Sequence, residues 1–279
     1  MNQFFQGYYF KHQKGAETLC VIAGRSDSNQ FIQIITQNGS WQTPMTKDCH
    51  FSKRGVILDI HTPDLSLTGK ISYHGLSPIR YDIMGPFRYL PMECRHGIIS
   101  MSHQLRGSVI WNGKNIDFTG GKGYIEKDSG RSFPSSYAWV QANDFREDCS
   151  IMAAVAEIPL CGLRFHGCIS VVHYRGKEYR FATYLGTRIL CCTKEKIILK
   201  QGNYLLLIQI HAKNGHNLNA PRNGKMSRTI IESASCPAEY VLYKGSNQIF
   251  HLFSYHTSFE YEYETGSLLS SSIFSGGSL

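Results

Sequence analysis

The sequence of 279 residues has few of the features that mark the common functional classes. No apolar run approaches the roughly 18–20 residues that a helix needs to cross a bilayer. The N-terminal residues show no basic segment followed by a long apolar core, so we expect no signal peptide. No Gly-x-Ser-x-Gly elbow, Gly-rich phosphate loop or dinucleotide fingerprint occurs, which argues against nucleophilic and nucleotide-dependent enzymes. We therefore expect a soluble, cytoplasmic protein.

Charge is also scarce, since only 18% of the residues are Asp, Glu, Lys or Arg. The net charge is +8, yet the basic residues are scattered and form no run. This dispersion argues against nucleic acid as a partner. General solubility explains the charge, and weak peripheral contact with an anionic membrane surface is an alternative.

The nine cysteines form no paired Cys-x-x-Cys framework. We interpret them as free thiols in a reducing compartment. Cys161, His166 and Cys168 are a weak candidate for zinc, because no second ligand cluster accompanies them. The sequence therefore predicts neither a metal nor another cofactor, and it leaves the oligomeric state open.

Aromatic residues and glycine are abundant, with 16 Tyr, 15 Phe and 26 Gly. Short alternating runs are separated by turn signals such as Asn38-Gly39, Asn112-Gly113 and Arg175-Gly176, and no amphipathic helix stands out. This pattern predicts an all-β protein of two consecutive antiparallel domains, each a barrel or sandwich. We place them at residues 1–145 and 146–262, followed by a Ser/Gly-rich tail at 263–279. Residues 216–225 are predicted to form a polar loop.

The densest mixture of charge, aromatics and turn residues is GYIEKDSGRSFPSSYAWVQANDF, residues 123–145. Its second part alternates, which places the larger, polar or aromatic side chains on one face of a strand, a candidate pocket wall. These side chains are Tyr137, Trp139, Gln141 and Asn143.

In the first part of this stretch, Glu126 and Asp128 share one strand face with Tyr124. Aromatic walls would remove water from such a carboxyl group and raise its pKa, which suits a general acid near neutral pH. Alternatively, Asp128 organises the following turn and Glu126 pairs with a Lys or Arg.

Two further groups are candidates for binding. In residues 92–103, Glu93 and Arg95 share one strand face and His96 lies on the other, as a pocket wall or as a structural ion pair. In residues 219–228, two arginines and a lysine could hold an anion, although a solvated loop is the commoner outcome.

Residues 123–145 closely resemble the signature of the tocopherol cyclase family, in which Glu-Lys-Asp/Asn-Trp-Gly precedes an Arg/Ser-Phe-Pro turn and Trp-x-Gln. MGPFRYLPMECRHGIISMSHQLRG (84–107), LNAPRNGKMSRTIIESAS (218–235) and GYYFKHQ (7–13) are also similar to that family, so the resemblance covers nearly the whole chain. It implies two lipocalin-like β-barrels and a relation to carotenoid hydratases and cofactor-free pericyclases. The plant cyclases protonate a prenyl double bond, and a neighbouring phenol captures the cation.

By position, the resemblance makes Glu126 and Asp128 the candidate proton donors. It implies that Tyr137 and Trp139 line the cavity, and that Arg131, Gln141 and Asn143 orient the head group of the substrate. Ser129 departs from the family pattern, which has Trp there, so the pocket is expected to be larger or differently shaped.

Three functions follow from these observations. The first is a cofactor-independent, tocopherol cyclase-like enzyme that protonates a lipophilic, prenylated small molecule and closes a ring or adds water. The second is a lipocalin-like carrier that holds a hydrophobic ligand without reaction. The third is an interaction protein with a packed barrel, which a structure without a cavity above roughly 300 Å³ would support.

Overall fold

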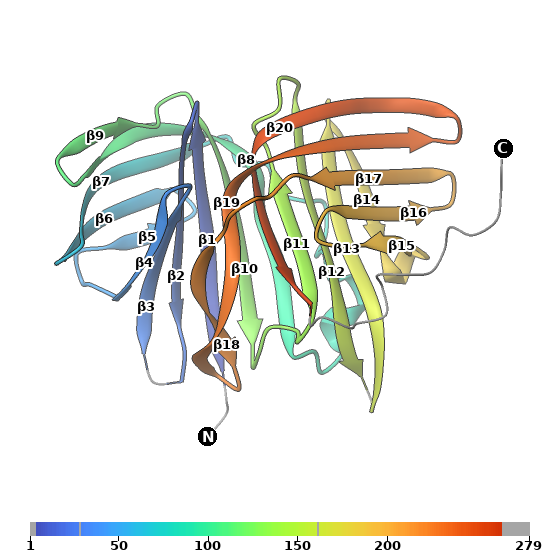
Figure 1. Ribbon diagram of the computed structural model, residues 1–279, viewed down its shortest axis with the longest axis horizontal. Helices are drawn as coiled ribbons and strands as arrows, with labels where there is room; N and C mark the ends of the chain where they lie inside the picture. Colours follow the sequence, from blue (N-terminus) through green and yellow to red (C-terminus); the bar gives the residue numbers. More distant parts are fainter. Residues whose placement is uncertain (1–3, 28, 161, 264–279) are drawn as a thin grey trace.

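The computed structural model describes residues 4–27, 29–160 and 162–263 as two antiparallel sheets of ten strands each (Figure 1). The first sheet has the order β4-β3-β2-β1-β10-β8-β7-β6-β5, with β9 paired to β8. Its strands are β1 (Phe5–Lys14), β2 (Glu17–Arg25), β3 (Gln30–Thr36), β4 (Gly39–Pro44), β5 (His50–Ser52), β6 (Gly55–Thr62), β7 (Leu65–His74), β8 (Cys94–Trp111), β9 (Lys114–Asp117) and β10 (Lys122–Gly130).

The second sheet has the order β14-β13-β12-β11-β20-β19-β17-β16-β15, with β18 paired to β19. Its strands are β11 (Tyr137–Ala142), β12 (Cys149–Leu160), β13 (Leu163–Tyr174), β14 (Lys177–Ala182), β15 (Arg188–Cys192), β16 (Lys196–Gln201), β17 (Tyr204–Ile210), β18 (His216–Arg222), β19 (Lys225–Lys244) and β20 (Asn247–Glu262). Two 3₁₀ turns, η1 (Gly85–Tyr89) and η2 (Thr183–Leu185), complete the described elements.

The two sheets lie side by side and are curled (Figure 1). Each encloses an apolar core of its own, and a third core joins residues of both sheets. The third core joins Tyr9, Met101 and Tyr124 of the first sheet to Trp139 and Met152 of the second. The predicted all-β fold with two antiparallel, barrel-like halves is therefore confirmed. Among the described residues, none lies in a helix that is long and apolar enough to cross a membrane.

The chain passes from the first sheet to the second between β10 and β11, in the linker 131–136. The division into domains at residues 145 and 146 stays a prediction. Of the predicted tail, residues 264–279 lie outside the described part of the chain, as does Cys161 of the zinc hypothesis.

One prediction about secondary structure is wrong, because residues 216–225 form most of a hairpin instead of a loop. β18 and the start of β19 meet at Asn223 and Gly224, which have positive φ values of 52° and 75°. Asn-Gly is the preferred pair for the two central positions of such a tight turn. The polar composition of this segment concealed a turn signal of the same kind as Asn112-Gly113.

Candidate active site

The centre of the site is one face of β10, which points toward the second sheet. Tyr124, Glu126 and Asp128 occupy alternate positions along this face. Tyr124 is 0% exposed and Glu126 is 5% exposed, whereas Asp128 is half-buried. In the register of the sheet, Glu126 lies beside Tyr9 of β1 and Ile98 of β8. The alternation predicted for this segment thus places both carboxyl groups between the sheets.

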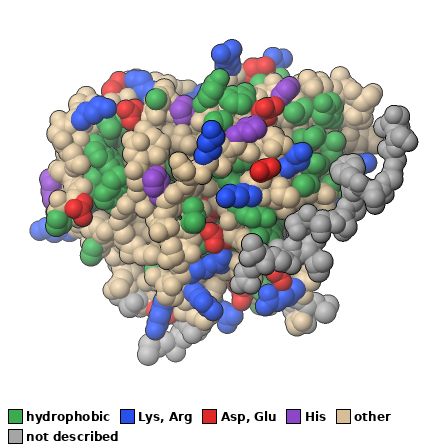
Figure 2. Space-filling model, in the orientation of Figure 1, with side chains coloured by type: hydrophobic (Ala, Val, Ile, Leu, Met, Phe, Trp, Pro, Cys, Tyr) green, Lys and Arg blue, Asp and Glu red, His purple; other side chains and the backbone are tan. Residues whose placement is uncertain are grey.

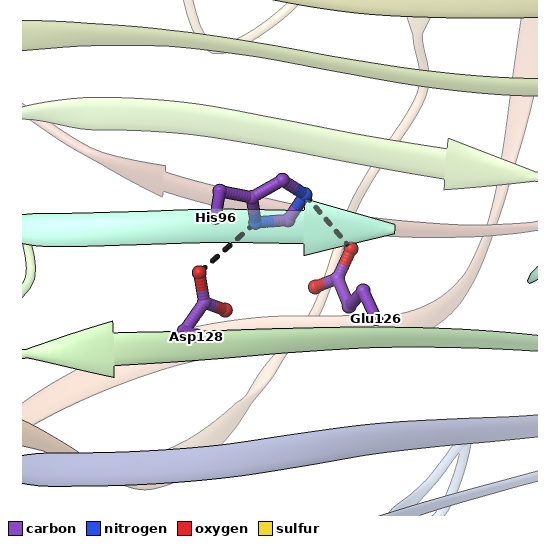
Figure 3. Close-up of side chains that lie close together, drawn as sticks. All are labelled: His96, Glu126 and Asp128. Carbon is purple, nitrogen blue, oxygen red and sulfur yellow. Dashed lines mark hydrogen bonds and ion pairs between the residues drawn. The ribbon is translucent and has the colours of Figure 1, made fainter. Parts of the chain in front are cut away.

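His96 on β8 lies between the two carboxyl groups (Figure 3). It is the register partner of Asp128, and its Nδ1 lies 3.0 Å from Oδ1 of Asp128. Its Nε2 lies 3.4 Å from Oε2 of Glu126, an ion-pair distance without hydrogen-bond geometry. The imidazole ring is therefore held by Asp128 on one side and faces Glu126 on the other.

Glu126 also receives two hydrogen bonds from aromatic side chains. The hydroxyl of Tyr124 donates to Oε2 at 2.5 Å, and Nε1 of Trp139 donates to the same oxygen at 3.2 Å. No described residue hydrogen-bonds Oε1, which leaves this oxygen free to carry a proton. Trp139 lies on β11, so these contacts connect the acid to the second sheet.

The surroundings change the pKa values of both groups. Burial raises the pKa of Glu126 to about 7, although His96 opposes this effect and Asp128 adds to it. Burial disfavours protonation of His96, but Asp128 and Glu126 outweigh it and raise its pKa to about 9. Near neutral pH the histidine is therefore cationic, while Glu126 exists partly as a neutral acid.

An apolar cavity of about 140 Å³ lies over these groups, between the two sheets. The described side chains that form its walls include Met84, Phe87, Met92, Phe133, Tyr137, Trp139, Ile158 and Ile169, with Glu126, Asp128 and His96 among the polar residues. Its volume is below the roughly 300 Å³ of small ligand pockets but close to that of a cavity that holds one benzene ring. A larger, polar hollow of about 730 Å³ adjoins it at Glu93, Phe133 and Pro159.

The segment around η1 covers this cavity and is anchored by the second sheet. Arg180 on β14 donates to the backbone oxygens of Tyr81 at 2.9 Å and Asp82 at 3.2 Å. The hydroxyl of Tyr184 donates to the backbone oxygen of Ile83 at 2.9 Å. These bonds hold Met84 and Phe87 in the cavity wall.

Two buried carboxyl groups of the second sheet were not predicted from the sequence. Glu260 lines the cavity, accepts a hydrogen bond of 2.5 Å from the hydroxyl of Tyr137, and lies opposite Glu232 in the pairing of β19 with β20. Burial and the neighbouring carboxylates raise the pKa of Glu260 well above its usual value, and burial raises that of Glu232 to about 7. The signal for Glu260 is a run of alternating acidic and aromatic residues, FEYEY at 259–263.

The structure brings only some of the predicted binding residues to the cavity. Tyr137, Glu93 and His96 line it, whereas Arg95 is exposed on the other face of β8. Arg131 is exposed and lies 3.7 Å from Glu93.

The two predicted amide residues are buried away from the described cavities. Gln141 is fully buried, and its amide hydrogen-bonds no described residue. Asn143 donates to the backbone oxygen of Gly123 at 2.9 Å and so ties the sheets together. Roles for these two residues and for the arginines in binding stay predictions.

His96, Glu126 and Asp128 also have the composition of a metal site, since one potential ligand atom from each lies within 4.8 Å of the others. However, the two carboxylates face different nitrogens of the ring, and a metal ion binds only one of them. A metal at Nε2 with Glu126 would leave Asp128 to orient the ring instead of binding the ion. The arrangement suits a network of proton-carrying groups better than a metal site of three ligands.

Comparisons with known proteins place the chain in a family and identify structures with the same fold. The model of the tocopherol cyclase-like family matches residues 72–266. A probable chloroplastic tocopherol cyclase from Oryza sativa subsp. japonica is 33% identical over 89 residues, which cover 29% of this chain and 18% of the rice protein. The matched segment thus spans less than a fifth of that protein.

Two solved structures share the fold. Kievitone hydratase from Nectria haematococca superposes with a TM-score of 0.56 at 11% identity, over 93% of this chain and 89% of its own. CghA, solved with Sch210972, has a TM-score of 0.57 at 9% identity, over 94% and 89% of the two chains. At such low identities the likeness shows the shared fold alone.

Proposed function

The chain belongs to the tocopherol cyclase-like family, and we propose that it protonates a double bond of a lipophilic, prenylated phenol and so closes a ring or adds water. One observation carries this proposal: the buried carboxyl group of Glu126 lines an apolar, ring-sized cavity beside the His96–Asp128 pair. Such a cavity excludes water from the cation that protonation creates.

Glu126 is the proton donor in this mechanism. Burial raises its pKa to about 7, so a large share of the protein carries this proton near neutral pH, and Oε1 delivers it to one carbon of the double bond. The carboxylate that remains is stabilised by the His96 cation and by hydrogen bonds from Tyr124 and Trp139. These groups are in place before the reaction, so the charge is stabilised without rearrangement.

Protonation leaves a tertiary carbocation at the other carbon, and aromatic side chains surround it. Trp139, Tyr137 and Phe133 line the cavity, and the quadrupole of such a ring attracts a cation that lies over its face. The phenol oxygen of the substrate then attacks this carbon and loses its proton, which returns to Glu126. Ring closure is thus an isomerisation, and attack by water instead gives the hydrated product.

Glu260 is the second carboxyl group that reaches the cavity, from the opposite sheet. Burial and the neighbouring carboxylates raise its pKa well above the usual value, so Glu260 is a neutral group that can donate a hydrogen bond to the oxygen of the phenol or water, while the proton returns to Glu126.

The test is incubation of the protein with geranylhydroquinone in D₂O, followed by mass spectrometry. We expect a cyclised or hydrated product with one carbon-bound deuterium, and a large loss of product with Glu126→Gln, of about 100-fold or more as is usual for a general acid. Glu195→Gln, an exposed glutamate that lines none of the described cavities, serves as the control. Unchanged turnover in both Glu126→Gln and Asp128→Asn would refute the assignment of the acid.

The same experiment separates the enzyme from the carrier. A carrier would return the bound compound unaltered and without deuterium after long incubation. No binding at all would support the third reading, an interaction protein with a packed interior.

A further inference from the structure

A second, smaller cavity of about 60 Å³ reaches the same acids from the other side of β10. Both cavities are lined by Glu126, Asp128, Glu260 and Phe133. The larger cavity lies on the His96 side of β10, and the smaller one lies on the β1 side. The two carboxyl groups of β10 therefore form a ridge between two chambers.

The smaller cavity exists because residue 7 is glycine. Gly7 is the register partner of both Asp128 on β10 and Gly24 on β2, and it lies between Phe5 and Tyr9 on the strand face that points toward the second sheet. A Cβ atom added to Gly7 would meet only Cγ2 of Ile22, at 3.9 Å. A glycine inside a strand weakens it, and such a residue often marks a place where a ligand comes close to the backbone.

The walls of this cavity suit an apolar group. Ile22, Phe31, Leu218 and Ile230 surround it from four strands. The two amides in its wall already have partners. Gln33 donates to the backbone oxygen of Asn219 at 2.9 Å and accepts from the backbone nitrogen of Asn219 at 2.7 Å, and the side chain of Asn219 donates to Gln42 at 2.5 Å. Apart from the carboxyl groups and the tyrosine hydroxyl, little in the described wall would solvate a polar ligand.

We propose that the cavity beside Gly7 is a second subsite, which binds the alkyl group on the far side of the reacting double bond. The inference rests on the proposed function and adds the shape of the substrate to it. The larger cavity has the volume for one aromatic ring, and the double bond lies over Glu126 on the ridge. Ring and alkyl group thus extend from the acid in opposite directions.

Phe133 of the linker 131–136 forms the partition at this junction. Its ring packs edge-on against Phe5 at 5.5 Å and Tyr137 at 6.0 Å, and it contacts both chambers and the polar hollow. A substrate therefore meets Phe133 whichever chamber it enters.

The experiment compares two probes in the Glu126→Gln background, which prevents turnover. Allylhydroquinone has the ring and the double bond but no group beyond it, whereas geranylhydroquinone has an alkyl chain there. We expect Gly7→Val to weaken the binding of geranylhydroquinone by about tenfold, which corresponds to roughly two buried methylene groups. The affinity for allylhydroquinone should change by less than about twofold. Affinities are measured by calorimetry.

Gly97→Val is the matched control, because Gly97 lies on the opposite face of the sheet, where its nearest neighbour is the flexible side chain of Lys127. If Gly7→Val does not fold, Ile22→Phe fills the same cavity from β2 and is judged by the same criterion. An equal loss for both probes, or no loss for either, would overturn the subsite but leave the proposed function intact. Failure of the unsubstituted Gly7 protein to bind either probe would overturn both.

Discussion

Nδ1 of His96 lies 3.0 Å from Oδ1 of Asp128, although the two residues are on different strands and 32 positions apart in the chain. The other nitrogen of the ring faces Glu126 at 3.4 Å. Asp128 raises the pKa of His96 and so keeps the histidine charged. The charged histidine in turn lowers the pKa of Glu126, which makes Glu126 a stronger acid. This relationship makes the pH dependence of the reaction sensitive to both neighbours.

We expect activity to be highest below pH 7 and to fall as the pH rises through the pKa of Glu126, which is about 7. His96→Gln removes a cation that lowers this pKa, so the midpoint of the fall should move to higher pH, and the maximal rate should drop by roughly 100-fold. Asp128→Asn removes an anion that raises this pKa directly, but it also removes the group that keeps His96 charged, so the midpoint should move up less than with His96→Gln. The measurement is the pH profile of turnover with geranylhydroquinone.

A midpoint that lies higher with His96→Gln than with Asp128→Asn is the signature of electrostatic coupling to one acid. The reverse order, or two unchanged midpoints, would contradict the role of Glu126 as the group that titrates.

The same pKa values predict how stability depends on pH. In the folded protein the pKa of Glu126 is about 7, above its usual 4.5. Its contribution to the free energy of unfolding is therefore complete below pH 4.5 and is lost as the pH rises through 7. The loss is on the order of 3 kcal/mol for this group alone. The pKa of His96 is raised from 6.5 to about 9, so His96 adds a further loss of stability as the pH rises from 6.5 to 9.

Glu126→Gln should therefore flatten the decline of the unfolding free energy between pH 5 and 8, measured with urea. Glu232→Gln should flatten it in the same range, because burial raises the pKa of Glu232 to about 7 as well. Glu195→Gln is the control with an exposed carboxyl group. Parallel pH curves for all four proteins would show that these carboxyl groups do not keep their protons on folding.

Much of the fold was predictable because most strands bury one face. Alternation within residues 123–145 placed Glu126 and Asp128 on one face and Tyr137 and Trp139 on another, and the hydrogen bond from Trp139 to Glu126 now joins the two segments. Such patterns report on one strand at a time. They do not say which strands pair or which faces meet.

The remainder of the site depends on contacts that are distant in the chain. The partnership of His96 with Asp128 follows from the register of β8 on β10, which two irregularities change on either side of Ile125. Glu260 reaches the site from a strand more than 100 residues away, and the importance of Gly7 appears only when Asp128 is its neighbour. Local sequence contains none of this information.

The covering segment around η1 gives a prediction about ligand exchange. Arg180 is buried, lies 3.0 Å from Glu178 and stacks at 3.5 Å on the ring of Tyr81. Arg180→Met would free the backbone of Tyr81 and leave Glu178 without its cation. Removal of one partner of a buried pair costs roughly 3 kcal/mol.

We expect this variant to unfold at lower urea concentration and to release geranylhydroquinone faster, measured by stopped-flow quenching of tryptophan fluorescence. Arg164→Met is the control, since Arg164 also pairs with a glutamate, Glu157, but is largely exposed. Equal release rates for the two variants would show that the covering segment does not limit exchange.

The last prediction concerns metal ions at His96, Glu126 and Asp128. Because the carboxylates face different nitrogens of the ring, we expect dialysis against EDTA to leave turnover of geranylhydroquinone unchanged. Zinc titrated by calorimetry should give the same heat with the unsubstituted protein and with Glu126→Gln. One equivalent of metal in the purified protein by elemental analysis, lost in both Glu126→Gln and Asp128→Asn, would show instead that the ring turns and that all three groups bind one ion.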